Sequence, residues 1–303
     1  MTGSLAVPTT RPVDVRLPEW IRIRPPDGAR YQDVRGTIRT LGLSTVCQEA
    51  RCPNLSECWS SGTATLMLLG SECSRRCGFC AVHTRWGRGV VDGTEPDRVA
   101  EGVARWGLRY VVLTQVCRDD LPDGGATILA RTVRALRERS PGTKVELLIG
   151  DLGGGSEALE MVLASRPDVL AHNLETVRRL SVAVRDRRAG YDRSLELLRR
   201  VSGSIDGRPV TKSSIMLGLG ETDQELHGAF EDLRSSGTDL LTLGQYLRPS
   251  PAHRPVDRYV DPKTFARLRS DALAAGFHGV EAGPLVRSSY HAEELYRSAR
   301  PGG

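Results

Sequence analysis

From about residue 63 onward, short apolar runs alternate with longer amphipathic segments. The apolar runs indicate buried strands, and the segments with apolar residues at helical spacing indicate a helix after each strand. We expect strands over residues 63–69, 110–114, 144–149, 169–172, 210–217 and 240–243. We expect helices over residues 95–106, 126–139, 156–164, 192–201, 222–235 and 262–275.

This repeated strand–helix order predicts the fold class. Six consecutive units predict a parallel sheet with right-handed crossovers, and six rather than eight predict a barrel that does not close. We therefore expect an α/β protein, a partial (β/α)6 TIM-type barrel with N-terminal and C-terminal extensions. The predicted divisions are an N-terminal extension over residues 1–62, the barrel over 63–275 and a C-terminal extension over 276–303. In such a barrel the chemistry lies at the carboxyl ends of the strands.

Several predicted helices carry start signals in the sequence. Pro96 and Pro262 occupy the first turns of two of them, where the missing N–H of proline is tolerated. Thr222 is followed three residues later by Glu225, the spacing of a capping box.

Composition and charge argue against several classes of protein. The chain has 303 residues, 39% of them hydrophobic, no apolar run long enough to span a membrane and no signal-peptide core near its start. We therefore expect a cytoplasmic protein with no membrane partner. The net charge is only +5, and the arginines are scattered in ones and twos. This pattern does not predict a nucleic-acid partner and fits an acidic protein partner equally well.

Six of the seven cysteines lie between Cys47 and Cys80, which indicates metal ligation or redox chemistry rather than a disulfide framework. Cys73, Cys77 and Cys80 directly follow the first predicted strand, at the expected catalytic edge. Three thiolates from one loop can hold three irons of a cubane and leave the fourth open for a substrate or cofactor. A zinc site normally has four ligands. Disulfide exchange through Cys77 and Cys80 leaves Cys73 unexplained.

The C-x-x-x-C-x-x-C spacing, with Phe79 just before the last cysteine, resembles the radical S-adenosylmethionine superfamily. The resemblance implies a [4Fe-4S] cluster whose open iron binds the methionyl group of S-adenosylmethionine. It also implies that one electron cleaves this cofactor to methionine and a 5′-deoxyadenosyl radical, which takes hydrogen from an unactivated carbon.

The first cysteine group, Cys47, Cys52 and Cys58, resembles the lipoyl synthase family. Further matches to that family lie at residues 118–121, 123–126, 172–175, 217–221, 241–247 and 287–292. The resemblance implies that this group binds an auxiliary [4Fe-4S] cluster, with Ser289 as a catalytic fourth ligand. A hard alkoxide on a thiophilic iron leaves easily, which suits a cluster that gives up sulfur.

The same resemblance implies a reaction and its partners. Two sulfur atoms enter an octanoyl chain at C6 and C8 while two S-adenosylmethionine molecules are consumed. The implied partners are an octanoylated lipoyl carrier protein or domain, an electron donor such as flavodoxin or ferredoxin, and an iron–sulfur carrier that rebuilds the auxiliary cluster.

Other polar residues follow the predicted strands. We interpret Phe79 as packing against cluster and adenine. The remaining expected cofactor contacts are Asn173, Glu175, Gly218, Gly220 and Glu221, although the glycines also fit ordinary turns. Residues 118–120 fit either a site contact or a surface salt-bridge cluster. We expect Cys117 to be a stray buried thiol, and we assign no role to His83, His227, His253 and His278.

Three segments depart from the family pattern, at residues 81–90, 150–155 and 187–191. All three are expected beside the active edge of the barrel. They leave open a related enzyme that inserts sulfur into a different acyl substrate. A non-catalytic iron or zinc scaffold is the alternative from another class.

Overall fold

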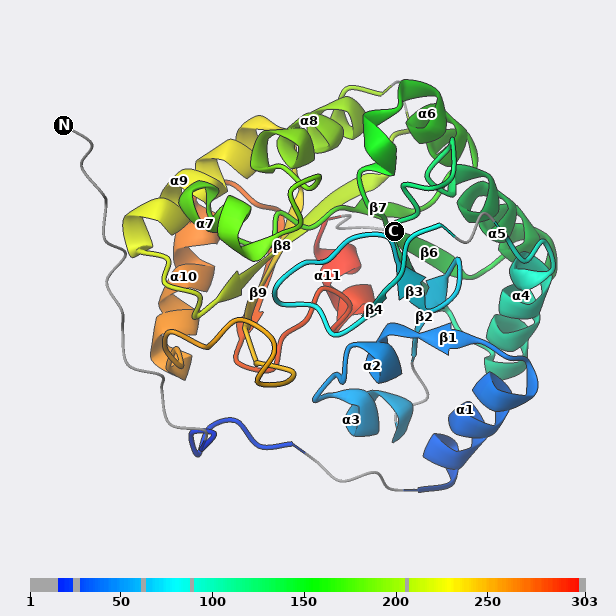
Figure 1. The fold of residues 1–303 in the computed structure, drawn as a ribbon, viewed down its shortest axis with the longest axis horizontal. Helices are drawn as coiled ribbons and strands as arrows, with labels where there is room; N and C mark the ends of the chain where they lie inside the picture. The colour runs from blue at the N-terminus through cyan, green and yellow to red at the C-terminus, as the bar shows by residue number, and fades with distance from the viewer. Residues whose placement is uncertain (1–15, 24–27, 61–63, 88–89, 205–206, 300–303) are drawn as a thin grey trace.

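The computed structural model describes residues 16–23, 28–60, 64–87, 90–204 and 207–299. Residue 63, the predicted start of the first strand, and residues 88 and 89 of one departing segment lie outside this range. Figure 1 shows a curved sheet surrounded by helices, with the chain winding steadily around it. Successive parallel strands in the described residues are β2 (Thr65–Leu68), β5 (Tyr110–Gln115), β6 (Lys144–Leu148), β7 (Val169–Ala171), β8 (Val210–Leu217), β9 (Leu240–Gln245) and β10 (Gly279–Gly283).

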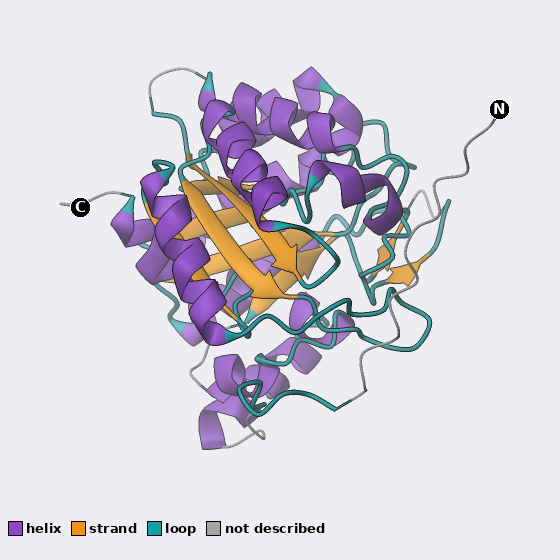
Figure 2. Cartoon of the chain, turned by 90° about the vertical axis from the view of Figure 1, so that its left-hand side faces the viewer, coloured by secondary structure: helices purple, strands orange, loops and turns teal. Residues whose placement is uncertain are grey.

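The outer layer consists of the helices that follow these strands, as Figure 2 shows. They are α4 (Glu95–Trp106), α5 (Ala126–Arg139), α6 (Ser156–Ala164), α8 (Tyr191–Ser202), α9 (Asp223–Ser235) and α10 (Pro262–Ala274). All six predicted helices are confirmed to within one residue at each end, and the six predicted strands to within two. Their apolar stripes pack on the sheet; in α4, for example, Val99, Val103 and Trp106 are buried.

Local capping chemistry explains two of these accurate helix starts. The Thr222 side chain accepts a hydrogen bond from the Glu225 amide, and the Glu225 side chain accepts one from the Thr222 amide, which completes the predicted capping box of α9. Asp261 accepts hydrogen bonds from the amides at the start of α10, with Pro262 in the first turn.

A seventh parallel strand, β10, is not predicted from the sequence and lies within the predicted C-terminal extension. Its sequence, Gly-Val-Glu-Ala-Gly, is too short and too rich in glycine to indicate a strand. Pairing with β9 supplies the hydrogen bonds that hold β10 in the sheet, although its own sequence has little strand preference. A side chain at Gly279 would approach Ser298 of α11 (Ala292–Ser298) within 2.1 Å, so glycine allows α11 to pack against the strand. The division at residue 275 stays a prediction.

The N-terminal helices pack on one edge of the barrel. They are α1 (Gly28–Thr40), α2 (Val46–Glu49) and α3 (Leu55–Ser60), and β1 (Ser44–Thr45) pairs antiparallel with β2. Tyr31 of α1 lies with its ring centroid 5.4 Å from that of the buried Trp59 in α3. This packing carries the first cysteine group to the edge of the sheet.

Short elements complete the catalytic edge. They are β3 (Glu72–Cys73), β4 (His83–Thr84), the 3-10 turn η1 (Leu152–Gly154) and α7 (Arg178–Val184). Over the described residues, no helix is long and apolar enough to cross a membrane.

A buried ion pair crosses the barrel interior. The Lys212 ammonium donates to both carboxylate oxygens of Glu146 at 2.9 and 3.1 Å, and the Tyr110 hydroxyl donates to the same carboxylate at 2.6 Å. Each of the two charged residues is only 1% exposed. Burial of these charges is tolerated because each is neutralised and hydrogen-bonded inside the barrel.

Candidate functional site

One cavity of about 1120 Å3 occupies the interior of the barrel. Strand residues such as Val112, Leu148 and Ser214 line it, and so does the tail segment that follows β10. All seven cysteines of the chain reach it, and all are free: Cys47, Cys52, Cys58, Cys73, Cys77, Cys80 and Cys117. The fold therefore brings both cysteine groups to one cavity.

The second cysteine group lies in the loop after β2, at the predicted carboxyl edge of the sheet. Neighbouring main chain holds this loop from several sides. The Gly78 amide donates to the Val184 carbonyl at 2.9 Å, and the Gly78 carbonyl accepts from the Arg254 amide at 2.9 Å. The Ser74 amide donates to the Cys117 carbonyl at 2.9 Å. These bonds fix the backbone that presents the three thiols.

A buried network of ion pairs also holds the same loop in place. Arg75, 6% exposed, donates to Asp119 at 2.6 Å and to Asp151 at 2.5 Å. Arg188 pairs with Asp119 at 3.3 Å and donates to the Ser74 carbonyl at 2.7 Å. Two of the segments that depart from the family pattern thus meet here through Asp151 and Arg188.

This network decides the open question about residues 118–120. Arg118 pairs with Asp120 at 2.8 Å, while Asp119 binds Arg75 and the Ser74 hydroxyl. Arg118, Asp119 and Asp120 are not among the residues that line the cavity. The geometry supports the salt-bridge interpretation. The ion-paired side chains at residues 118–120 are largely buried rather than on the surface.

The thiols of the second group differ in acidity. Burial raises the pKa of Cys77 to about 11 and that of Cys80 to about 12. A hydrogen bond from Cys117 lowers the pKa of Cys73 to about 6, against the effect of burial. Cys117 is half-buried rather than the stray buried thiol that we expect from the sequence, and it contacts a cysteine of the site. Iron binding requires the thiolates, so cluster assembly releases protons from Cys77 and Cys80.

The first cysteine group lies on α2 and α3 at the barrel edge. Burial raises the pKa of Cys47 to about 11. Burial also raises the pKa of Cys52, and the nearby Arg287 guanidinium opposes this effect. Thr45 caps α2 by accepting a hydrogen bond from the Gln48 amide, which fixes the turn that carries Cys47.

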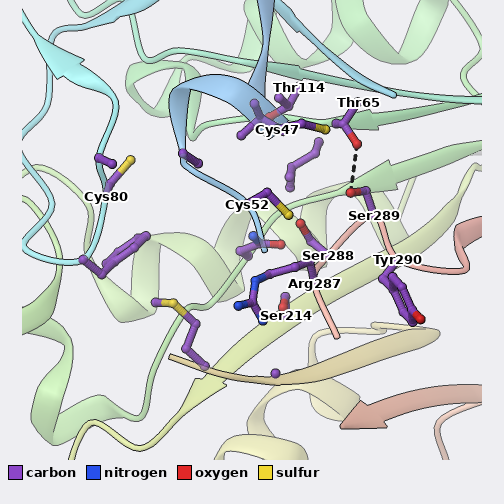
Figure 3. A pocket seen from close by; sticks show the side chains of 18 of the residues that line it. Cys47, Cys52, Thr65, Cys80, Thr114, Ser214, Arg287, Ser288, Ser289 and Tyr290 are labelled. Carbon is purple, nitrogen blue, oxygen red and sulfur yellow. Dashed lines mark hydrogen bonds between the residues drawn. The ribbon is translucent and has the colours of Figure 1, made fainter. Parts of the chain in front are cut away.

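The tail after β10 meets this first group across the open edge of the barrel. Figure 3 shows Ser289 facing Thr65, whose hydroxyl donates to the Ser289 hydroxyl at 2.9 Å. The Asn54 amide group donates to the Leu285 carbonyl at 2.6 Å, and the Tyr290 hydroxyl donates to Glu57 at 3.3 Å. The tail thereby links β10, at one end of the sheet, to β2 near the other end and to the first cysteine group.

A glycine lets the tail take this path. A side chain at Gly244 of β9 would lie 2.1 Å from the Val286 carbonyl oxygen, far inside the van der Waals contact distance. The tail thus lies directly on the backbone of β9. Arg287 and Ser288 follow at once, and Figure 3 places both beside Cys52.

The donor set fits iron–sulfur clusters better than a single metal ion. Within the described ranges, no three His, Cys, Asp or Glu side chains converge as ligands of one ion. A structural zinc ion needs four such ligands around itself. In a four-iron cubane each cysteine binds a different iron, so the ligands are spread around the cluster. Two separated groups of three free thiols in one cavity match the second arrangement.

Three of the predicted cofactor contacts line the cavity, namely Phe79, Asn173 and Glu175. Glu175 has a positive φ of 70°, a strained conformation for this residue, and its amide is held by the Ser214 carbonyl. The Asn173 side chain donates to Glu175 at 3.1 Å, but its own buried oxygen has no partner. Burial raises the pKa of Glu175. A polar ligand group would satisfy this orphaned acceptor.

The other three predicted contacts, Gly218, Gly220 and Glu221, are not among the residues that line the cavity. A side chain at Gly218 would lie 2.4 Å from the Arg258 carbonyl oxygen. The Glu221 carboxylate accepts hydrogen bonds from the amides of Gly218 and Leu219 at 2.7 and 2.9 Å. These contacts shape the loop after β8, so the expected approach to an adenosyl group has no support in the geometry and stays a prediction.

Two histidines contact the site: His253, to which we assign no role from the sequence, and His172, which lies in one of the stretches that match the family. His253 lies 3.1 Å from the Cys80 carbonyl oxygen through Nε2 and 2.8 Å from the Ser250 hydroxyl through Nδ1. His172 is buried and lines the cavity, and burial lowers its pKa to about 4. Because its Nδ1 donates to the Ile149 carbonyl, Nε2 accepts from the Ser194 hydroxyl.

Comparison with known proteins gives the family. Residues 67–233 match the model of the radical SAM superfamily, and residues 3–52 match that of the N-terminal domain of lipoyl synthase. The chain is 55% identical over 295 residues to lipoyl synthase of Thermus thermophilus, covering 97% of this chain and 91% of the relative. It is 53% identical to lipoyl synthase of Symbiobacterium thermophilum, covering 95% and 89%.

Solved structures resemble the chain in fold alone. Streptococcus suis SuiB bound to its precursor peptide SuiA aligns with a TM-score of 0.56 at 13% identity, covering 76% of this chain and 50% of that one. Methylornithine synthase (PylB) aligns with a TM-score of 0.53 at 13% identity, covering 82% and 74%. The partial-barrel prediction is confirmed.

Superfamily membership implies S-adenosylmethionine and a [4Fe-4S] cluster as cofactors. The C-x-x-x-C-x-x-C loop lies within the matched region, and the two cysteine groups share one cavity with the serine tail. With identities above 50% over nearly the whole of two relatives, the chain belongs to the lipoyl synthase family of the radical SAM superfamily.

Proposed function

We propose that this chain inserts two sulfur atoms, at C6 and C8, into an octanoyl chain that is amide-linked to a lysine of a lipoyl carrier protein or domain. The observation that carries the proposal is the single cavity, which joins both cysteine groups to the serine tail. A radical generator and a sulfur source must face the same substrate carbon, and a shared cavity allows this. Membership of the family supports the same reaction.

Cys73, Cys77 and Cys80 would hold the cluster with the open iron. When bound there, S-adenosylmethionine supplies the hydrogen-abstracting radical. Glu175 lies close enough to Cys77 and Cys80 to raise the pKa of both thiols by its charge. Glu175 and Asn173 are therefore placed to bind polar groups of this cofactor, and Phe79 adds an apolar wall.

Cys47, Cys52, Cys58 and Ser289 would hold the auxiliary cluster. The Thr65 hydroxyl orients the Ser289 oxygen by a hydrogen bond of 2.9 Å. Arg287 is half-buried beside Cys52, so its positive charge offsets the negative charge of nearby thiolates.

The walls of the cavity suit an acyl substrate. Met67, Val112 and Leu148 present apolar side chains from three strands. Such a lining accepts an alkyl chain and keeps water and polar side chains away from a radical. An electron donor such as flavodoxin or ferredoxin and an iron–sulfur carrier complete the proposed set of partners.

One experiment decides reaction and substrate together. The protein is reconstituted anaerobically and its iron and sulfide are counted; two clusters give about eight of each per chain. It is then supplied with reductant, S-adenosylmethionine and an octanoyl-lysine carrier peptide. We expect 5′-deoxyadenosine and a peptide mass gain that corresponds to two sulfurs. Formation of 5′-deoxyadenosine with no sulfur on the peptide would refute the octanoyl assignment and favour a different acyl substrate.

Neighbouring serines provide a matched pair of variants. Ser289→Ala removes the proposed iron ligand, so sulfur insertion should be lost while cleavage of S-adenosylmethionine continues. Ser288→Ala removes a hydroxyl that makes no hydrogen bond within the described ranges, and it should retain sulfur insertion. Equal activity of the two variants would remove Ser289 from the site.

A further inference from the structure

The outer face of the second cysteine loop carries a group of residues, four of them exposed and one half-buried, that the reaction above does not use. We call this group the basic patch: Arg76, Trp86, Val182, Arg187 and Arg188. Val182 is 89% exposed and Trp86 59% exposed, which is unusual for large apolar side chains. Arg76 and Arg187 are exposed too, and no side-chain hydrogen bond or ion pair is recorded for either in the described part of the chain.

Direct contacts join the cysteine loop, Trp86 and residues 186–188, and Val182 lies on α7, just before the last of these segments. The Arg76 amide donates to the Asp186 carboxylate at 2.9 Å, which places the cysteine loop against the segment after α7. The Arg188 guanidinium lies 5.1 Å from the centre of the Trp86 ring. Arg188 also neutralises Asp186 through a contact of 2.9 Å. Positive charge is therefore left in excess on this face.

The patch lies one hydrogen bond away from a cluster ligand. The Asp186 amide, between α7 and the exposed Arg187, donates to the Cys77 sulfur at 3.3 Å. Electron transfer through protein weakens steeply with the gap between donor and acceptor. A route through one backbone amide to an iron-bound sulfur is short.

The patch faces away from the substrate space. None of its five residues is among those that line the cavity, whereas Arg185 and Cys77 from the same segments do line it. A protein docked on the patch could approach the cluster without blocking the cavity. This separation favours an electron donor over the acyl carrier, whose modified lysine must enter the cavity.

We infer that the basic patch is the docking surface for a small acidic one-electron carrier protein of the flavodoxin or ferredoxin class. The inference rests on the proposed function, because each cleavage of S-adenosylmethionine needs one electron. The donor is oxidised by one electron and the cluster is reduced by one. The electron then passes to the sulfonium, whose bond to C5′ breaks to give methionine and the 5′-deoxyadenosyl radical. Complementary charge mainly accelerates the encounter of two proteins.

The test compares two reductants on the full-length reconstituted protein. Arg187→Glu, alone and combined with Arg76→Glu, reverses charge on the patch. With reduced flavodoxin at low salt, we expect 5′-deoxyadenosine formation to slow by about tenfold, and its salt dependence to weaken. With reduced methyl viologen, a small molecule that needs no docking surface, the rate should equal that of the wild type. Arg134→Glu on α5, also exposed and without a recorded partner, is the matched control.

Each outcome has a definite meaning. Unchanged flavodoxin-driven rates in the patch variants would overturn the inference, and so would an equal loss with both reductants, because that indicates a damaged loop. A loss of sulfur transfer to the carrier peptide with methyl viologen as reductant would assign the patch to the substrate carrier instead. Absence of 5′-deoxyadenosine from the wild type with methyl viologen would refute the proposed function itself, whatever the variants do.

Discussion

Arg75 is the buried cation on which the position of the second cysteine loop depends. We expect Arg75→Leu to lower the free energy of unfolding of the cluster-free protein. The substitution removes the guanidinium that binds Asp119 and Asp151 and leaves two buried carboxylates. Burial alone would raise the pKa of Asp151, but its contacts with Arg75 hold that pKa below the ordinary value.

The expected size follows from the partners that remain. Removing one member of a buried ion pair typically costs about 3–5 kcal/mol. Here Arg188 stays 3.3 Å from Asp119, and Arg193 stays 3.5 Å from Asp151. Each carboxylate keeps one cation nearby, so we expect a smaller loss of about 2–3 kcal/mol, at or below the lower limit of the cited range.

Urea unfolding of the anaerobic, reduced, cluster-free protein measures this loss from the shift of the midpoint at constant slope. Arg105→Leu is the control. Among the described residues Arg105 pairs with Glu101 alone, on the exposed face of α4, so the substitution should cost less than about 0.5 kcal/mol. Adding Asp119→Asn and Asp151→Asn should restore much of the lost stability, because no buried charge is then unpaired. A loss no greater than that of the control would refute the assignment of Arg75 as a structural cation.

Three further predictions concern other parts of the barrel. Lys212→Met should lower the free energy of unfolding by about 3–5 kcal/mol, since Glu146 stays buried and charged; Glu146→Leu in the same chain should recover most of it in urea titrations. Glu225→Gln should cost about 0.5–1 kcal/mol at neutral pH. The arginine partner of Glu225 lowers its pKa to about 2. The difference in stability between wild type and variant is therefore fully present above the unfolded pKa of about 4.3. It should vanish in melting curves as the pH falls towards 2. Gly244→Ala should displace the tail at Val286 and abolish sulfur insertion in the carrier-peptide mass assay, while leaving cofactor cleavage measurable.

The predicted elements agree best with the observed fold where contacts within a few residues of the chain set their ends. Helix α9 begins where Thr222 and Glu225 predict it, because a capping box is satisfied within four residues. Strand β10 was missed for the opposite reason. Its residues have little strand preference of their own, and pairing with β9 supplies the hydrogen bonds.

The candidate site shows the same contrast between features that the local sequence predicts and features that depend on tertiary contacts. The cysteine spacing predicted both groups and their separate character, and Phe79, Asn173 and Glu175 line the cavity. Gly218, with its positive φ of 94°, looked like a place for a cofactor to approach, but the protein's own backbone occupies that space. A glycine signals a close approach without saying which group approaches.

The sequence by itself determined the order of strands and helices, the two groups of thiols and the family. These depend on periodicity, capping and spacing along the chain. Only the tertiary structure decided that Ser289 meets Thr65, 224 residues earlier, and that Asp119, Asp151 and Arg188 surround Arg75. The physical reason is the curvature of the sheet. It places strand ends and loops side by side according to their position around the sheet. The separation of two residues along the chain therefore does not predict such contacts.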